Sequence, residues 1–237
     1  MITTLDQKHS SRSEKYKVVA TREIAARFKE LGFVVDEYME ARVRKADRIG
    51  YQKHMVRLSN PNLVSAHNDI KLQLLVTNSH DGSTSFKMQL GFYRFVCSNG
   101  LIVGETFESI RLRHSGDIVE EIDEAIERIV AQTNRLDALI SKMKTKELSF
   151  VESARFIEEA IKLRNLKGVT EFPVLRPEDM SSDLFTLYNR VQEMLVNGGV
   201  NYRNQRDRTR RLRGVSNIAA LTKINEQLFD LAARYAA

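Results

Sequence analysis

The sequence contains one cysteine, Cys97, in the stretch FYRFVCSNGLIVGE that spans residues 92–105. A nucleophilic cysteine needs a base, usually a histidine, to form the reactive thiolate. No motif around the histidines in the N-terminal half of the sequence indicates such a pairing. Free cysteine is among the most buried residue types, and Asn99 and Gly100 both tolerate the positive φ of a tight turn. We therefore expect Cys97 to be structural and Asn99-Gly100 to close a hairpin.

A metal site is the second chemistry that the residue types suggest. The candidate ligands are His54, His80, Asp81 and His114. Zinc or non-haem iron requires three or four such side chains that converge. No HxH, HxxxH or CxxC spacing occurs, and adjacent His80 and Asp81 would point to opposite faces of an extended chain. We expect no metal and no cofactor, and we keep a metal-dependent nuclease built on these residues as an alternative.

Common catalytic and phosphate-binding motifs are missing from the sequence. It has no GxxxxGK[ST], GxGxxG, GxSxG or HExxH pattern. The carboxylate pairs Glu120-Glu121 and Glu158-Glu159 fall on the polar faces of predicted helices, where a solvated surface explains them. We therefore expect a non-catalytic protein.

Positive charge is concentrated in two segments. The whole chain carries +6, and residues 203–213, RNQRDRTRRLR, hold six arginines and one aspartate, which amounts to +5. These arginines are Arg203, Arg206, Arg208, Arg210, Arg211 and Arg213, and Tyr202 precedes them. The second segment, residues 41–57, sets one acid, Asp47, against Arg42, Arg44, Lys45, Arg48, Lys53 and Arg57.

Arginine clusters of this kind are typical of phosphate-binding surfaces. The guanidinium group binds phosphate through two parallel hydrogen bonds and stacks on bases. Neutralising several phosphates releases counterions, which makes binding tight at low salt. Tyr38, Tyr51 and Tyr93 could add rings that stack on unpaired bases. The competing interpretation is a solvated loop that aids solubility.

The composition is that of a globular protein. Apolar residues are 42% and charged residues 29% of the 237 positions, which is ordinary. No apolar run approaches the ~20 residues that cross a bilayer, and the start, MITTLDQKHSSRSEK, lacks the apolar core of a signal peptide. A single cysteine fits a reducing compartment such as a cytoplasm. We expect residues 1–14 to be a flexible leader.

Residues 15–117 predict an α+β region. Thr21 is expected to cap a helix over residues 22–31. Alternating, β-branched and aromatic segments then predict an antiparallel sheet. These segments are FVVDEYMEARVR, KHMVRLS, DIKLQLLVTNS, TSFKMQLGFYRFVC, LIVGE and FESIRLRH, and YKVVA before the helix is a further candidate strand.

Residues 118–237 predict an all-helical region, which could also join the sheet in one continuous domain. An apolar stripe favours one helix of roughly 25 residues. Its members are Ile118, Ile122, Ala125, Ile129, Leu136, Ile140 and Met143, with Thr133 filling a gap. Further helices are expected over about 150–165 behind a Ser149–Glu152 capping box, from Ser182 to Gly198-Gly199, and over about 215–235.

The central segment resembles a known family. The stretch NSHDGSTSFKMQLGFYRFVCSNGLIVGE, followed by IRLRHSG, is similar to the uncharacterised phage/plasmid-like protein family, domain of unknown function nine-three-two. The shared residues are Arg94, Val96, Cys97, Asn99, Gly100 and Leu101, then Arg113 and His114. Earlier YKVVATREIAARFKELG and KHMVRL and later LFTLYNRVQEMLVNGG extend the resemblance over most of residues 15–235. It implies a phage or plasmid origin and a bacterial cytoplasm, and it implies no activity or catalytic residue.

These observations together favour a phage- or plasmid-encoded protein that binds nucleic acid without catalysis, with single-stranded DNA as the ligand. An antiparallel meander followed by a long helix looks like the core of phage single-strand annealing proteins, an analogy of fold alone. Surplus apolar helix faces lead us to expect a homo-oligomer. The alternative is a protein-interaction module that acts on a host or phage factor.

Overall fold

The computed structural model describes residues 4–95, 100–102, 109–112, 114, 118–169, 174–204 and 206–237. The chain divides into two compact units, one of residues 1–93 and 107–133 and one of residues 94–106 and 134–237. The change from predicted strands to predicted helices had suggested a division near residue 117, and the two units of the structure meet along the chain at residues 93, 106 and 133. The expected α+β class with an antiparallel sheet is confirmed.

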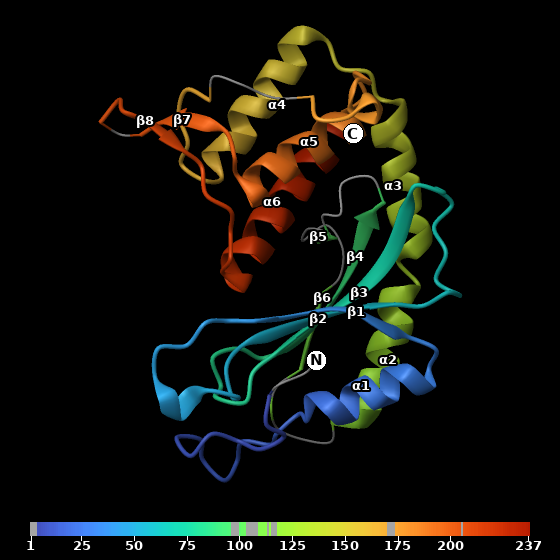
Figure 1. Cartoon of the computed structure of the whole chain (residues 1–237). Coiled ribbons are helices and arrows are strands. Elements are labelled where there is room, and N and C mark those ends of the chain that lie inside the picture. The colour runs from blue at the N-terminus through green and yellow to red at the C-terminus, as the bar shows by residue number, and fades with distance from the viewer. Residues whose placement is uncertain are drawn as a thin grey trace. The chain divides into compact units, whose positions relative to one another are not determined.

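The first unit is built on an antiparallel sheet (Figure 1). Its strands are β1 (Val34–Glu40), β2 (His54–Ser59), β3 (Ile70–Asn78), β4 (Phe86–Arg94) and β6 (Ser109–Leu112). They follow the order β1-β2-β3-β4, and β6 also pairs with β4. Every residue of β2 is buried, and the strand pairs with β1 on one side and with β3 on the other. A short 3-10 helix, η1 (Ala46–Arg48), lies in the β1–β2 connection.

Two helices accompany this sheet. α1 (Thr21–Glu30) buries Ile24 and Phe28, which lie with Val56 and Leu58 of β2 around one small apolar pocket. α2 (Ile118–Val130) lies beside β6. The guanidinium group of Arg27 joins the two helices through two hydrogen bonds to the Asp123 carboxylate, at 3.1 and 2.6 Å.

The N-terminal segment differs from the expected flexible leader. The side chains of Thr4 and His9 are buried, and the backbone of Leu5 donates to the Gly50 carbonyl at 2.8 Å. The Tyr16 hydroxyl donates to the Ser79 carbonyl at 2.8 Å. The segment is therefore docked on the first unit, through backbone groups that no sequence pattern reveals. YKVVA forms no strand. Its Lys17 N–H donates to the His114 carbonyl at 2.9 Å, and its Val19 carbonyl accepts from the Asn78 side-chain amide at 2.8 Å.

The predicted long helix is two helices. α2 ends at Val130 and α3 (Thr133–Thr145) begins three residues later. At the break, the backbone N–H of residue 132 donates to the Ile129 carbonyl, three residues back instead of four. The apolar stripe is nevertheless correct where side chains are described, since Ile122, Ala125, Ile129, Leu136, Ile140 and Met143 are all buried.

The second unit is a helical bundle. α4 (Phe150–Lys162) begins at the predicted Ser149–Glu152 capping box. α5 (Leu184–Asn197) is capped by Asp183 rather than Ser182, and α6 (Ile218–Ala236) is capped by Asn217. The three helices contact one another pairwise. Tyr188 and Phe229 meet edge to face between α5 and α6, with their ring centroids 6.0 Å apart.

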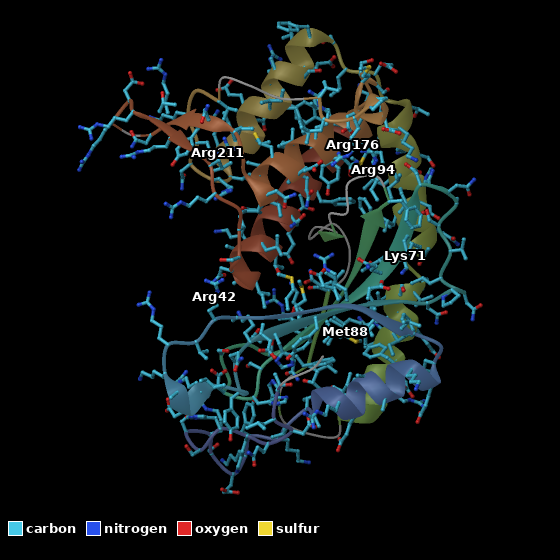
Figure 2. The ribbon with its side chains drawn as sticks, in the orientation of Figure 1. Arg42, Lys71, Met88, Arg94, Arg176 and Arg211 are labelled. Atoms are coloured by element: carbon cyan, nitrogen blue, oxygen red, sulfur yellow. The ribbon has the colours of Figure 1, made fainter. Side chains whose placement is uncertain are left out.

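A buried ion network lies within the second unit, which begins at Arg94 (Figure 2 labels Arg94 and Arg176). Arg94 donates to the Asp179 carboxylate at 2.9 Å, and both side chains are buried. Arg176 donates to the same carboxylate and bidentately to Glu193. Asp179 ends the short 3-10 helix η2 (Pro177–Asp179). Each buried charge in this network therefore has a partner, which burial requires.

The sequence had suggested an all-helical C-terminal half, and this prediction is wrong. Two strands, β7 (Asn201–Arg203) and β8 (Thr209–Arg211), pair in a separate antiparallel sheet. β8 lies within the arginine-rich segment 203–213, and β7 ends at the first residue of that segment. The segment lacks the alternating apolar residues that indicate a strand. The pairing therefore depends on contacts with the rest of the unit.

A substitution at Gly198 would test how closely this hairpin is attached to α5. Its φ is +73°, and a Cβ atom there would lie 2.4 Å from the carbonyl oxygen of Leu212. Gly199 has a φ of +87° but open space around its Cα. We expect Gly199→Ala to lower the free energy of unfolding by about 1 kcal/mol through backbone strain. Gly198→Ala should cost clearly more, measured as the urea midpoint of the full chain. Equal costs for the two variants would show that the hairpin base can move away from α5.

Candidate nucleic-acid interface

The β7–β8 hairpin projects from the helices of its own unit (Figure 1). Hydrogen bonds hold its base: Gly199 N–H donates to the Leu212 carbonyl at 2.9 Å, and Leu212 N–H donates to the Val200 carbonyl at 2.8 Å. Arg203 N–H donates to the Lys167 carbonyl at 2.9 Å. The Leu212 side chain is buried. These contacts fix the hairpin at its base.

Arg164 adds a side-chain anchor beneath the hairpin. Its guanidinium group donates to the carbonyl oxygen of Leu195 at 2.7 Å and to that of Arg213 at 3.0 Å. Burial lowers the pKa of Arg164. This cation therefore joins the last turn of α5 to the chain that leaves the hairpin, and it satisfies carbonyl groups that a helix end leaves without a partner.

The turn of the hairpin is ordered by one side chain. The Asn204 amide oxygen accepts hydrogen bonds from the backbone N–H groups of Arg206 and Arg208, at 2.9 and 3.1 Å. Asp207 adopts a φ of +54°, a conformation that Asp and Asn tolerate better than most residues. The carboxylate of Asp207 pairs with Arg203 at 2.9 Å. The tip is therefore a defined turn rather than an open loop.

All six predicted arginines of this segment are exposed: Arg203, Arg206, Arg208, Arg210, Arg211 and Arg213. Arg211, labelled in Figure 2, is the last residue of β8. Arg203 is paired with Asp207. The other five form no ion pair with any carboxylate in the described part of the chain, and a surface depression is lined by Asn204, Arg206, Arg208 and Arg210. The hairpin is thus a compact patch of uncompensated positive charge.

The second basic segment is only partly exposed. Arg42, Arg44 and Lys45 are exposed and Lys53 is half-buried. Arg48 is also half-buried and lies 3.5 Å from the Asp81 carboxylate. Arg57 lies in β2, where it is buried and its Nε is 3.0 Å from the Glu37 carboxylate. Arg57 and Arg48 therefore serve the fold, and the exposed part of this segment is the β1–β2 connection.

The tyrosines expected to stack on bases are not fully exposed. Tyr38, Tyr51 and Tyr202 are half-buried, and the Tyr93 side chain lies outside the described residues. Tyr51 meets the ring of His9 edge to face, with centroids 5.2 Å apart. The support for nucleic-acid binding therefore comes from charge, and base stacking by these rings stays a prediction.

Two of the candidate metal ligands, His54 and His80, do come together, but in a hydrogen-bonded core. Their rings lie edge to face with centroids 5.5 Å apart. His54 Nδ1 donates to the Gln52 carbonyl at 3.0 Å, which leaves Nε2 to accept from the Thr21 hydroxyl at 2.7 Å. Thr21 was predicted to cap a helix, and instead its hydroxyl completes this pair.

The remaining candidate ligands are also committed to structural contacts. The ring nitrogens of His80 face the backbone carbonyls of Leu5 and Val19. Asp81 accepts from Ser83 N–H at 2.9 Å, and His114 Nδ1 lies 3.2 Å from the Lys17 carbonyl. Among the described residues, no group of three or more His, Cys, Asp or Glu side chains has the arrangement of a metal site. These side chains hold the N-terminal segment and the sheet together.

The predicted turn after β4 can be followed only in part. Cys97 and Asn99 lie outside the described residues. Gly100 begins β5 (Gly100–Ile102), and β5 is the neighbour of β4 in the strand order. The tight turn expected at Asn99-Gly100 and the structural role of Cys97 therefore stay predictions.

Sequence reasoning missed the residues that build the hairpin. Asn204 and Asp207 are common turn residues, so their spacing within the arginine run was a usable signal. Leu212 is the one apolar residue among residues 203–213, which fits its position as the buried side chain at the base of the hairpin. Arg164 gave no signal, since its partners are backbone carbonyls from distant positions.

Comparison with known families agrees with the resemblance in the sequence. The family model described as Domain of unknown function (DUF932) matches residues 8–216. The chain belongs to this family. Members of it are thus expected to share both units, since the match spans the sheet and most of the helical bundle.

Two curated relatives come from Escherichia coli (strain K12). The UPF0380 protein YafZ and the UPF0380 protein YfjQ are each 32% identical to this chain over 233 residues, covering 96% of the chain and 85% of the relative. No solved structure matches this chain. In the part of the chain that the structure describes, no helix is both long and apolar enough to span a membrane.

The buried His54 predicts a pH dependence of stability. Burial lowers the pKa of His54 to about 4, below the 6.5 of an unfolded chain. The unfolded state therefore binds the proton more readily between these values. The contribution of His54 to stability is fully present above pH 6.5 and is lost as the pH drops toward 4. We expect a loss of up to about 3 kcal/mol in the free energy of unfolding across this window. His54→Gln should flatten that slope in urea titrations at several pH values. A wild-type slope in the variant would contradict the neutral, buried histidine.

Proposed function

We propose that this protein binds nucleic acid by holding phosphate groups with the β7–β8 hairpin. The observation that carries the proposal is the group of five exposed arginines without a carboxylate partner, Arg206, Arg208, Arg210, Arg211 and Arg213. Like charges that lie this close repel one another and oppose folding. A polyanion removes that repulsion, and it gains the planar two-point hydrogen bonding that a guanidinium group offers to phosphate.

The way the hairpin is built supports a binding role over a solubility role. A solubility loop needs charge but no defined turn, whereas here Asn204 orders the tip and Leu212 and Arg164 fix the base. A segment that is already ordered loses less conformational entropy when it binds a ligand. Solubility would also be served by charge spread over the surface, and most of the net charge lies in this one segment.

The exposed β1–β2 connection is a second candidate contact. Arg42, Arg44 and Lys45 are exposed there. The first unit therefore also carries exposed basic side chains. We assign this segment a supporting role, since it adds charge to the binding of a long polyanion. Single- and double-stranded nucleic acids share the phosphate charge on which this function depends.

Salt dependence tests the proposal directly. The variant with Arg206, Arg208, Arg210 and Arg211 changed to alanine loses four exposed cations and no described ion pair. Binding of a labelled random-sequence oligonucleotide should weaken, and the slope of log K against log salt should flatten by about 3, because each phosphate contact contributes about 0.7 to 0.9. Fluorescence anisotropy at several salt concentrations measures both quantities.

A matched variant separates local charge from net charge. Changing Lys142, Lys146, Arg155 and Lys223 to alanine removes the same four charges from exposed positions on or beside the helices of the second unit. This control should keep a slope close to that of the native protein. If both variants bind alike, or if the native protein shows no salt-sensitive binding, the hairpin is a solvated surface and the proposal is wrong.

One observation favours a second candidate function, a protein-interaction module that includes self-association. Phe150, Val151 and Met180 are 89%, 57% and 75% exposed. An antiparallel bridge between Glu147 and Asp183 places the start of α4 beside the segment that leads into α5. These apolar side chains therefore gather at one end of the bundle, and a second copy of the chain is the partner that the expected homo-oligomer requires.

Light scattering at tens of micromolar, a range typical of weak association, tests this second function. If the patch joins two copies, the native chain should have the mass of an oligomer, and Phe150→Ser with Met180→Ser should give the monomer mass. Both side chains are exposed, so the change should leave the fold intact, which circular dichroism can check. A native chain that is monomeric under these conditions would rule out self-association through this patch.

A further inference from the structure

We propose that the β7–β8 hairpin enters a groove of double-stranded DNA, with one arginine-bearing face toward each of the two phosphate strands that border the groove. This inference rests on the nucleic-acid binding proposed above and names the form of ligand. It depends on how the two strands distribute their side chains between the faces of the hairpin.

The register places arginines on both faces. Asn201 lies opposite Arg211, Tyr202 opposite Arg210, and Arg203 opposite Thr209. Directly opposed residues of an antiparallel pair share a face, and successive residues alternate. Arg203 and Arg211 therefore share one face, and Arg210 occupies the other with Tyr202. A binding surface for one strand of nucleic acid would need charge on one face only.

The aromatic content of the hairpin also disfavours a single strand. Proteins that hold unpaired bases combine a basic groove with exposed rings on which successive bases stack. Tyr202 is the one aromatic residue in residues 201–213 and it is half-buried. Unpaired bases would find charge on this hairpin but no stacking surface, whereas paired bases already stack on one another and need none.

The dimensions of the hairpin fit a duplex groove. The major groove of B-form DNA is about 12 Å wide and admits a two-stranded β-ribbon. Between its two faces the hairpin is only one strand thick, since its side chains point out perpendicular to the plane in which the strands pair. This leaves room for arginine side chains to reach the phosphates on both sides. The major groove of duplex RNA is deep and narrow, so the same hairpin should distinguish the two duplexes.

Arg210 and Arg211 offer a matched pair of variants. They are adjacent in β8, both are exposed, and they lie on opposite faces. Arg210→Ala and Arg211→Ala are each measured against random-sequence DNA of equal length in single-stranded and duplex form, and against duplex RNA. Because both side chains are exposed, the variants should unfold at the temperature of the native protein, which is checked first.

The native protein should bind duplex DNA more tightly than single-stranded DNA or duplex RNA. Each variant should flatten the salt slope on duplex DNA by about 0.9, the contribution of one phosphate contact. Equal or tighter binding of the single strand, with the salt slope retained, would overturn the groove inference and leave nucleic-acid binding intact. An effect of one variant alone on duplex DNA would likewise overturn it, since one face would then suffice. Absence of salt-sensitive binding to all three ligands would overturn both proposals.

Discussion

The second unit must hold several like charges close together on a segment that has almost nothing to bury. An isolated two-stranded hairpin is marginal in water, and arginine repulsion makes this one less stable still. The burial of Leu212 and the hydrogen bonds from Gly199, Arg203 and Arg164 supply what the hairpin lacks. These contacts explain why the bundle ends as it does: α5 stops at two glycines, and the chain returns beside its last turn before α6 begins.

The first unit solves a different problem, which is how to attach a polar N-terminal segment to a sheet. It does so with buried polar groups, and the histidines near the end of β3 and the start of β2 are central to that attachment. His54 and Thr21 satisfy one another, and His80 faces the carbonyls of Leu5 and Val19. A buried histidine whose nitrogens are engaged by the protein is poorly placed to bind a metal. The arrangement therefore supports a structural role for residues that, by type alone, suggest catalysis.

Local patterns predicted most of the elements, and distant partners decided the rest. The Ser149–Glu152 box and the alternation in β3 depend on neighbours in sequence, so both were predictable. Thr21 was predicted to cap a helix, but its hydroxyl bonds to the distant His54 instead. Arg57 was predicted to be an exposed cation, but it is buried beside the distant Glu37. The break between α2 and α3 falls at Ala131–Gln132, where no glycine or proline marks it. The arginine cluster was evident from composition, but its hairpin was not, since β7 and β8 owe their pairing to Leu212 and the turn at Asn204.

Arginine-specific labelling of the full chain tests the central claim most directly. Phenylglyoxal modifies exposed guanidinium groups, and mass spectrometry reports each site with and without a saturating DNA oligonucleotide. The hairpin account predicts that DNA protects Arg206, Arg208, Arg210 and Arg211, which are exposed and free of ion pairs with described carboxylates, while Arg155 on α4 stays reactive. Full reactivity of the four hairpin arginines in the presence of bound DNA would contradict the account, because the phosphate contacts would then lie elsewhere on the protein.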